Sequence, residues 1–345
     1  MADAPRLAID AMGGDEGLAV MLRGVALARR RWPGLTFDLV GDEAQLAPAL
    51  ENHPNLKANS AIVHAADVIS GSERAGQAIR RAKSTSMGIA IDRVKKGQCG
   101  AAVSAGNTGA LMALAKLALR TMPGIDRPAL AALLPSLGEN DFVMLDLGAN
   151  TECEARNLIE FAIMGAAYSR IALGVERPRV SLLNIGTEDL KGTDTIRDAA
   201  STLREAGHLH LDFQGFIEGD KISRGETDVV VCDGFTGNIS LKTMEGTARF
   251  VTDLLRRAFT SSIRSKFGFL ISRPATELMR HHLDPNNHNG AVFLGLNGVV
   301  VKSHGGATDY GVANAIGVAA KLVAENITER ISEDLAVIRP TAAAA

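Results

Sequence analysis

The sequence of 345 residues is short of cysteine, of aromatic residues and of excess charge, and each shortage excludes a class of protein. Its three cysteines are too few and too scattered for a disulfide scaffold, and none forms a C-x-x-C pair. With 11 Phe, 2 Tyr and 1 Trp, a surface that stacks nucleic-acid bases or sugars is not expected. Lys and Arg number 37 against 39 Asp and Glu, so no overall positive field is available to bind nucleic acid.

Several signatures of cofactor, metal and nucleophile chemistry are also absent. The sequence contains no G-x-G-x-x-G fingerprint, no Gly-Lys dipeptide of a Walker loop, no H-E-x-x-H and no G-x-S-x-G. Its eight histidines lack the spacing of metal ligands. It also shows no secretory signal and no apolar run of the roughly 18 residues that span a membrane. We therefore expect a cytoplasmic protein in which cofactors, metal ions and covalent Ser or Cys nucleophiles are disfavoured.

What the sequence does contain is a recurring unit: a short apolar run, a glycine-rich loop, and then an amphipathic stretch. The 35 glycines favour many tight strand-to-helix turns. Because the runs are continuously apolar, they predict parallel strands that are buried on both faces. We predict one α/β domain over 1–340, with a doubly wound, mostly parallel sheet in three layers, and a disordered tail over 341–345. The expected strands are 6–10, 36–40, 101–104, 142–147, 180–185, 228–232 and 298–302.

One segment, 254–283, does not fit this alternation. It is helical in character and locally basic, and it predicts a helical hairpin that projects from the α/β body, with FGFLI (267–271) at its turn. Its apolar stripe could be a dimer interface with solvated basic residues around it. Alternatively, the hairpin could contact an anionic membrane surface. The residues expected to make that contact are Phe267, Phe269, Leu270, Ile271, Arg264 and Lys266.

Five loops follow predicted strands and are rich in small and hydrogen-bonding residues. Free backbone N–H groups and the helix dipole at each helix start favour phosphate. Ligands of open α/β sheets bind at the carboxyl ends of the strands, so we expect the five loops to gather at one edge. The loop over 104–109 is the first candidate for phosphate binding, although the same residues would also make a capped turn. Its candidate residues are Ser104, Gly106, Asn107, Thr108 and Gly109.

The other four loops add charged and polar side chains. One contains Asp10, whose ordinary role would be helix capping, and another contains Lys191, which could equally be a surface lysine. His304 could be a satisfied buried histidine. Since no nucleophile motif accompanies these groups, they indicate transfer to or from an anion that is itself the nucleophile. The candidate residues are Asp10, Gly186, Thr187, Lys191, Asp233, Gly234, Thr236, Asn238, Ser303 and His304.

Seven motifs, in their order along the chain, resemble those of one known family. They are LAIDAMGGD, SAGNTGALMA, GIDRPAL, LDLGAN, LLNIGTEDLKG, CDGFTGN-x-x-LK and KSHGG. The resemblance is to the phosphate acyltransferases of bacterial phospholipid synthesis, the PlsX family, and it runs from about residue 7 to 316. Two short segments, 71–74 and 215–220, depart from the family's pattern.

The resemblance implies a reaction and a set of partners. A protein of this family transfers the acyl group of acyl-[acyl-carrier-protein] to inorganic phosphate. The acyl phosphate then feeds the membrane acyltransferase that acylates glycerol 3-phosphate. The resemblance also implies a fold like that of the phosphotransacetylase and isopropylmalate-dehydrogenase group, a homodimer, and peripheral association with the membrane. A carrier protein is acidic, so the basic hairpin could receive it as well.

Residue roles for such a reaction follow from its chemistry. Phosphate is an anion at pH 7 and can attack a thioester without a covalent enzyme intermediate. We expect Lys191 to bind the phosphate charge, and Asn238 and His304 to stabilise the oxyanion or the departing thiolate. Asp10 would orient one of these groups or accept a proton. Cys232 is expected to be a buried strand cysteine rather than a nucleophile.

Three other functions remain open at the level of sequence. A phosphotransacetylase that uses acyl-coenzyme A would share the chemistry. A dehydrogenase of the related fold is disfavoured by the missing dinucleotide fingerprint. A non-enzymatic scaffold at the membrane would bind lipid without turnover.

Overall fold

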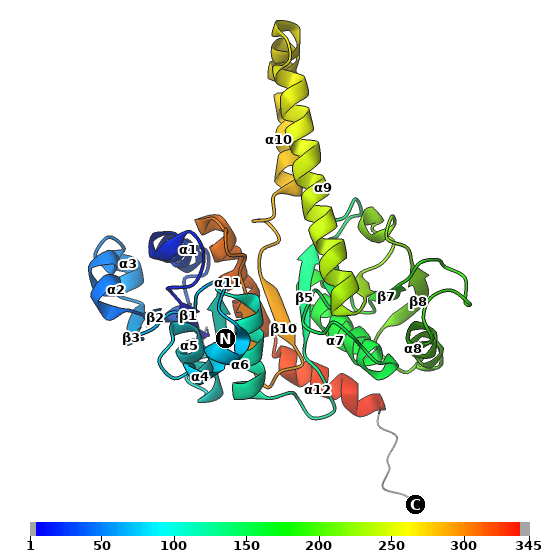
Figure 1. Cartoon of the computed structure of the whole chain (residues 1–345), viewed down its shortest axis with the longest axis horizontal. Coiled ribbons are helices and arrows are strands. Elements are labelled where there is room, and N and C mark those ends of the chain that lie inside the picture. Colours follow the sequence, from blue (N-terminus) through cyan, green and yellow to red (C-terminus); the bar gives the residue numbers. More distant parts are fainter. Residues whose placement is uncertain (1–4, 339–345) are drawn as a thin grey trace, which may run out of the picture.

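The structure is a computed structural model of the chain, and it describes residues 5–338. A single 11-stranded sheet runs through its centre in the order β3-β2-β1-β4-β11-β10-β5-β6-β9-β7-β8, with helices on both faces (Figure 1). The predicted tail at 341–345 lies outside the described residues. The strands are β1 Arg6–Asp10, β2 Thr36–Gly41, β3 Ser60–His64, β4 Ala101–Ser104, β5 Ala129–Leu134, β6 Phe142–Leu145, β7 Arg179–Leu183, β8 Asp212–Ile217, β9 Val229–Val231, β10 Ala291–Leu294 and β11 Val299–Lys302.

The helices mostly alternate with the strands, as the recurring unit predicts, but β6 follows β5 directly and β11 follows β10 directly. Two apolar layers separate them from the sheet, because alternate residues of a strand point to opposite faces. Leu7 and Ile9 of β1 belong to one layer, and Ala8 belongs to the other. The predicted three-layer α/β fold is therefore confirmed. The helices are α1 Gly17–Arg31, α2 Glu43–Leu50, α3 Pro54–Lys57, α4 Ala75–Arg80, α5 Ser86–Lys95, α6 Thr108–Leu119, α7 Ala155–Leu173, α8 Asp194–Glu205, α9 Gly234–Thr260, α10 Ile263–Leu283, α11 Asp309–Ala324 and α12 Ile327–Ile338.

Two strands reverse direction in the middle of the sheet. Strand β10 is antiparallel to both β11 and β5, and β5 is antiparallel to β6. As a result, β1, β2, β3, β4 and β11 run one way, whereas β6, β7, β8 and β9 run the other way. The carboxyl ends of the two groups therefore lie at opposite edges of the sheet. We call these the first edge, where β1, β4 and β11 end, and the second edge, where β6, β9 and β7 end.

All seven predicted strands are present within a residue or two of their expected bounds, but four further strands were not predicted. One of them is β5, whose sequence ALAALL consists of strong helix formers. It forms a strand because it is buried between β10 and β6, which pair with it on both sides.

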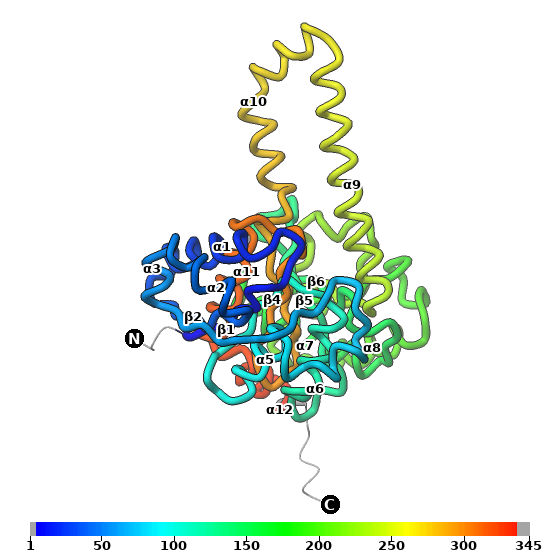
Figure 2. The backbone as a smooth tube through the Cα atoms, turned by 60° about the vertical axis from the view of Figure 1, so that its left-hand side comes forward, coloured from blue at the N-terminus to red at the C-terminus, as the bar shows by residue number. Residues whose placement is uncertain are grey.

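The hairpin is longer than predicted, and its turn lies elsewhere. Helices α9 and α10 project together from the body of the molecule (Figures 1 and 2). Helix α9 already begins at Gly234, because the Asp233 side chain caps it by accepting a hydrogen bond from the N–H of Thr236. The turn falls at residues 261–262, so the prediction that residues 267–271 form it is wrong; they lie inside α10. Within the described part of the chain, no helix is long and apolar enough to span a membrane.

Candidate functional site

The structure separates the five candidate loops into two groups, and the expectation that all five share one edge is wrong. The loops after β1, β4 and β11 lie at the first edge, and the loops after β7 and β9 lie at the second. The cause is the antiparallel pairing of β5, which reverses one half of the sheet relative to the other. Ser104 and His304 therefore belong to one group, and Lys191 and Asn238 belong to the other.

At the first edge, Asp10 and Ser104 form a closed interior contact. The Ser104 hydroxyl donates to Asp10 Oδ2 at 2.7 Å and accepts from the Gly106 N–H at 3.1 Å. The Asp10 side chain is only 1% exposed, and burial raises its pKa. The contact shapes the turn after β4, and the catalytic role expected of Asp10 stays a prediction.

The Asn107 side chain supports the capped-turn interpretation of the 104–109 loop. Its Oδ1 accepts from the N–H of Ala110, and its Nδ2 donates to the backbone oxygens of Gly71 and Glu73. The amide group is thus engaged within the protein, and it ties the loop around 71–73 to the start of α6. Thr108 and Gly109 form the exposed first turn of this helix.

The loop after β11 is held by a residue that the sequence analysis did not single out. Asn289 is buried; its Nδ2 donates to the Ser303 hydroxyl at 2.8 Å, and its Oδ1 accepts from the His304 N–H at 2.8 Å. Ser303 is fully buried, so its hydroxyl supports the loop from inside, and its predicted place in a substrate loop stays a prediction. The partly exposed His304 ring accepts from the Gly306 N–H through Nδ1, which leaves the proton of the neutral ring on Nε2. Burial lowers the His304 pKa, so the neutral form is favoured.

Lys302 ends strand β11 beside this loop. Its ammonium group donates to the backbone oxygen of Ala105 at 3.3 Å and to that of Ser303. Burial lowers its pKa to about 8, and the positive charge of Lys242 on α9 acts in the same direction. Lys242 also lowers the pKa of His304, so α9 passes close to the first edge after starting from the second.

At the second edge, the buried carboxylate of Asp146 joins three segments of chain. It accepts hydrogen bonds from the N–H groups of Leu130 and Ala149, and from both the backbone and the side chain of Asn150. The Asn150 side chain also donates to the Pro128 backbone oxygen, and the backbone oxygen of Asn150 accepts from the Gly234 N–H. The start of β5, the turn after β6 and the start of α9 are therefore fixed relative to one another. Desolvation raises the pKa of Asp146 in spite of these bonds.

Asn238 lies in the first turns of α9, above this joined region. Gly148 has φ +127, and a Cβ placed on it would lie 3.5 Å from the Cβ of Asn238. The candidate residues before it serve as the helix start: Asp233 caps the helix and also accepts from the Thr236 hydroxyl, while Gly234 is buried. Asn238 itself is exposed.

Lys191 lies on the loop after β7, the strand next to β9. The loop is ordered by its neighbours: Asn184 Nδ2 donates to the Lys191 oxygen at 3.1 Å, and Arg197 donates to the Gly192 oxygen at 2.7 Å. The Lys191 side chain is exposed, and its stem passes over the buried Gly186. Thr187 is exposed on the same loop. Lys191 and Asn238 thus follow neighbouring parallel strands at one edge.

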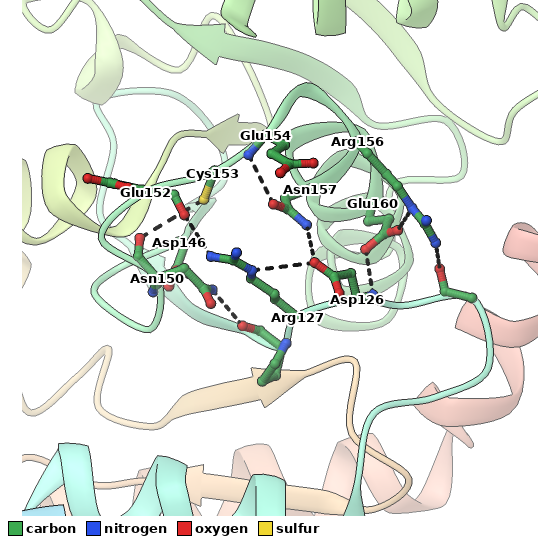
Figure 3. A network of polar contacts seen from close by, with 12 residues as sticks. Asp126, Arg127, Asp146, Asn150, Glu152, Cys153, Glu154, Arg156, Asn157 and Glu160 are labelled. Carbon is green, nitrogen blue, oxygen red and sulfur yellow. Dashed lines mark hydrogen bonds and ion pairs between the residues drawn. The ribbon is translucent and has the colours of Figure 1, made fainter.

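A network of charged residues surrounds Arg127 at the second edge (Figure 3). Arg127 precedes β5 in the GIDRPAL motif, and its Nη1 donates to the backbone oxygen of Glu152 at 2.9 Å. Its Nε lies 3.4 Å from Asp126 Oδ2. Asp126 in turn contacts Asn157 and Glu160 of α7. The sequence analysis used the motif only for resemblance and did not identify Arg127 as a site residue.

The cysteines are unsuited to nucleophilic catalysis. Cys232 is buried as predicted, and burial raises its pKa well above the usual value. Burial also raises the pKa of Cys153 to about 11 and that of Cys99 to about 12. Because the thiolate is the reactive form, none of the three is an activated nucleophile. Over residues 5–338, no group of three or more His, Cys, Asp or Glu side chains is arranged to hold a metal ion.

The fold resembles that of phosphotransacetylases. The phosphotransacetylase of Streptococcus pyogenes superposes with a TM-score of 0.60 at 17% identity, covering 94% of this chain and 95% of that one. The EutD phosphotransacetylase of Staphylococcus aureus gives a TM-score of 0.59 at 16% identity, covering 93% and 94%. At these identities the similarity supports the fold, which agrees with the predicted group.

Sequence comparison shows the family. Residues 5–330 match the model of the fatty acid synthesis protein family. The phosphate acyltransferase of Erythrobacter litoralis is 67% identical over 96% of this chain and 94% of its own length. That of Rhodospirillum rubrum is 48% identical over 98% and 97%. The chain therefore belongs to the phosphate acyltransferase (PlsX) family of acyltransferases, and its reaction is the transfer of an acyl group to phosphate.

Proposed function

We propose that the acyl donor is a long-chain acyl-[acyl-carrier-protein] and that the acyl phosphate product enters phospholipid synthesis. The observation that carries this proposal is the match over residues 5–330 to a family described by fatty acid synthesis, together with a phosphate acyltransferase at 67% identity. Fatty acid synthesis holds its acyl chains as thioesters of a carrier protein, which makes that thioester the donor of choice.

The reaction needs no covalent enzyme intermediate. An oxygen of phosphate attacks the thioester carbonyl carbon, and a tetrahedral oxyanion forms. When it collapses, the C–S bond breaks and the carrier thiolate leaves, taking up the proton that the phosphate gave up. Correct positioning of the two reactants can supply about 7–11 kcal/mol of the barrier reduction, and one oxyanion donor about 3–4 kcal/mol. The raised pKa values of Cys153 and Cys232 support this direct attack over a thiol intermediate.

We place the reaction at the second edge. Lys191 carries a charge on an ordered loop for the phosphate, and Asn238 offers an amide donor for the oxyanion on the next strand's helix. In this scheme the buried Asp10 and Ser303 hold the first edge together and do not contact the reactants. His304, whose neutral ring donates through Nε2, lies at the first edge and is not paired with Lys191 in this scheme.

The partners follow from the exposed hairpin. No residue of α10 is buried, and its apolar side chains stand among arginines and lysines. A long apolar surface of this kind is rarely left free in a monomer. We propose that the hairpin contributes to a homodimer and to contact with an anionic membrane surface. There the product would reach the membrane glycerol-3-phosphate acyltransferase.

The deciding experiment is the release of free thiol from palmitoyl-[acyl-carrier-protein] with and without phosphate, run beside palmitoyl-coenzyme A. Phosphate-dependent release with the carrier-protein donor alone is expected. Lys191→Ala is expected to raise the KM for phosphate at least tenfold, and Asn238→Ala to lower kcat by about a hundredfold. Lys57→Ala serves as the control, because Lys57 lies in α3 next to β3, at the opposite end of the strand order from β7 and β8.

Two results would contradict the proposal. Equal or better use of palmitoyl-coenzyme A would make the protein a phosphotransacetylase. Release from the carrier-protein donor that does not require phosphate would make it a thioesterase. If instead Lys191→Ala left both the phosphate KM and kcat unchanged, the second edge would lose its assigned phosphate residue.

A further inference from the structure

We infer that Arg127 is a further phosphate-binding residue of this site. It would act beside Lys191, which binds phosphate, and Asn238, which stabilises the oxyanion. This inference rests on the proposed location of the reaction at the second edge. Four observations support it: the position of Arg127 in the fold, the way its loop is fixed, the hydrogen-bonding capacity left on its guanidinium, and the chemistry of phosphate.

The position follows from the reversed strand. Arg127 comes just before β5, and the amino end of β5 lies where β6 and β9 end. The Asp146 and Asn150 bonds tie this loop to the turn after β6 and to the start of α9. Arg127 itself bonds to this region, because its Nη1 donates to the backbone oxygen of Glu152 in the segment between β6 and α7. Arg127 is thus near the helix that bears Asn238.

Helix α7 fixes the loop that contains Asp126 and Arg127. The other buried side chains of this helix are largely apolar. Two buried polar residues of α7 both form hydrogen bonds with Asp126. Asn157 Nδ2 donates to Asp126 Oδ2 at 3.1 Å, and Glu160 Oε2 accepts from the Asp126 N–H at 2.9 Å. Asp126 in turn lies against the Arg127 guanidinium (Figure 3). Burying a polar group costs free energy unless the group is hydrogen-bonded. Here the hydrogen bonds of Asn157 and Glu160 hold Asp126, which in turn orients Arg127. Asp126, Asn157 and Glu160 are positioning residues.

The guanidinium keeps donors for a ligand. Nη1 is bonded to the Glu152 oxygen, and Nε faces Asp126 at 3.4 Å. Among residues 5–338, no acceptor is found for the Nη2 hydrogens, and the side chain is 39% exposed. A planar guanidinium presents parallel N–H groups that match two oxygens of a phosphate. Phosphate near pH 7 carries between one and two negative charges, which one lysine alone does not balance. Arg127 supplies a further positive charge at this edge.

Binding of inorganic phosphate, measured by titration calorimetry without any acyl donor, tests this assignment directly. Arg127→Gln is expected to weaken phosphate binding at least tenfold, and Arg127→Lys less so, because lysine keeps the charge but loses the fork. Arg156→Gln is the matched control: Arg156 belongs to the same network and is 68% exposed, but its Nε binds Glu160 and it points away from the turn after β6. Its effect should be less than twofold.

Kinetics separate a phosphate ligand from a structural residue. In Arg127→Gln, the KM for phosphate should rise by the same factor as the calorimetric Kd, while the KM for the acyl donor stays unchanged. Added guanidinium ion should partly restore phosphate binding to Arg127→Ala, which a loss of folding would not allow. Wild-type phosphate affinity in Arg127→Gln, or equal weakening in Arg156→Gln, would overturn the inference. A different result would overturn the proposed donor and leave the role of Arg127 intact. In that result, phosphate binding depends on Arg127, but the protein does not use carrier-protein thioesters.

Discussion

Lys302 shows how burial sets the charge state of a single residue. Its amine lies at the end of a central strand, bonded to backbone oxygens and not to a carboxylate. Desolvation disfavours the ammonium form and lowers the pKa from 10.5 to about 8, although Asp15 and Asp10 act in the opposite direction. In the unfolded chain the same amine is solvated and keeps its ordinary pKa.

The stability of the protein should therefore depend on pH through Lys302. Between about pH 8 and 10.5 the unfolded chain binds the proton that the folded protein has released, so the free energy of unfolding rises with pH. Relative to Lys302→Met, the gain should total on the order of 3 kcal/mol across this range, because one pKa unit corresponds to about 1.4 kcal/mol. Urea unfolding at pH 7.5, 9 and 10.5 measures it, with Lys57→Met as control. A pH-independent difference between wild type and Lys302→Met would refute the expectation.

Helix α9 depends on the closeness of its start to the sheet. A Cβ on Gly237 would lie 1.9 Å from the Asp146 backbone oxygen and 2.8 Å from Cys232 Sγ. The helix can approach the ends of β6 and β9 only because this position has no side chain. Gly246, farther along the same helix, has nothing within 4 Å of its Cβ position. Gly237 is therefore required for close packing, whereas the position of Gly246 has room for a side chain.

Alanine at each of these positions should give opposite results. Gly237→Ala forces the start of α9 away from the sheet, and it should cost about 1–3 kcal/mol of stability and displace Asn238. Gly246→Ala should be neutral or add up to about 1 kcal/mol through helix propensity. Thermal unfolding and the phosphate-dependent release of carrier-protein thiol report both effects. Full activity in a stably folded Gly237→Ala would show that the close contact does not position Asn238.

At the scale of the whole molecule, the projecting part of the hairpin, including all of α10, adds no buried residue to the core of the body. It projects as a pair of long helices (Figure 2), and Phe259 contacts Phe269 across it at 5.3 Å between ring centroids. Large apolar side chains remain exposed along α10, including Phe267, Leu270 and Ile271. Such a surface implies a partner outside the single chain.

A triple substitution of the hairpin tests the membrane as that partner. Phe267→Ser, Leu270→Ser and Ile271→Ser together should reduce flotation with phosphatidylglycerol vesicles at least fivefold, because they remove the apolar contact and leave the basic residues. Leu137→Ser, a change at an exposed leucine of the body, is the control. The melting temperature should stay unchanged. Unaltered flotation together with a loss of the dimer in sedimentation would assign these side chains to the dimer interface.

The repeated apolar runs and the ordered motifs are local properties, and the sequence predicted them well. Seven strands, the α/β class, the family and the burial of Cys232 follow from side chains that are adjacent in the chain. The motifs also include most of the residues that the structure places at strand ends. Their hydrogen bonds were not predictable, since Asn107 and Ser303 have the same polar groups whether these face a ligand or the protein interior.

The grouping of the loops was decided by tertiary structure alone. The direction of a strand depends on the strands that pair with it, and these are distant in the chain: β5 pairs with β10 on one side and β6 on the other. Nothing in ALAALL encodes that reversal, yet it moves Lys191 and Asn238 to the edge opposite His304 and brings Arg127 to their side. The sequence by itself thus determined the family and the repertoire of polar side chains. Long-range pairing determined which of them face the same space.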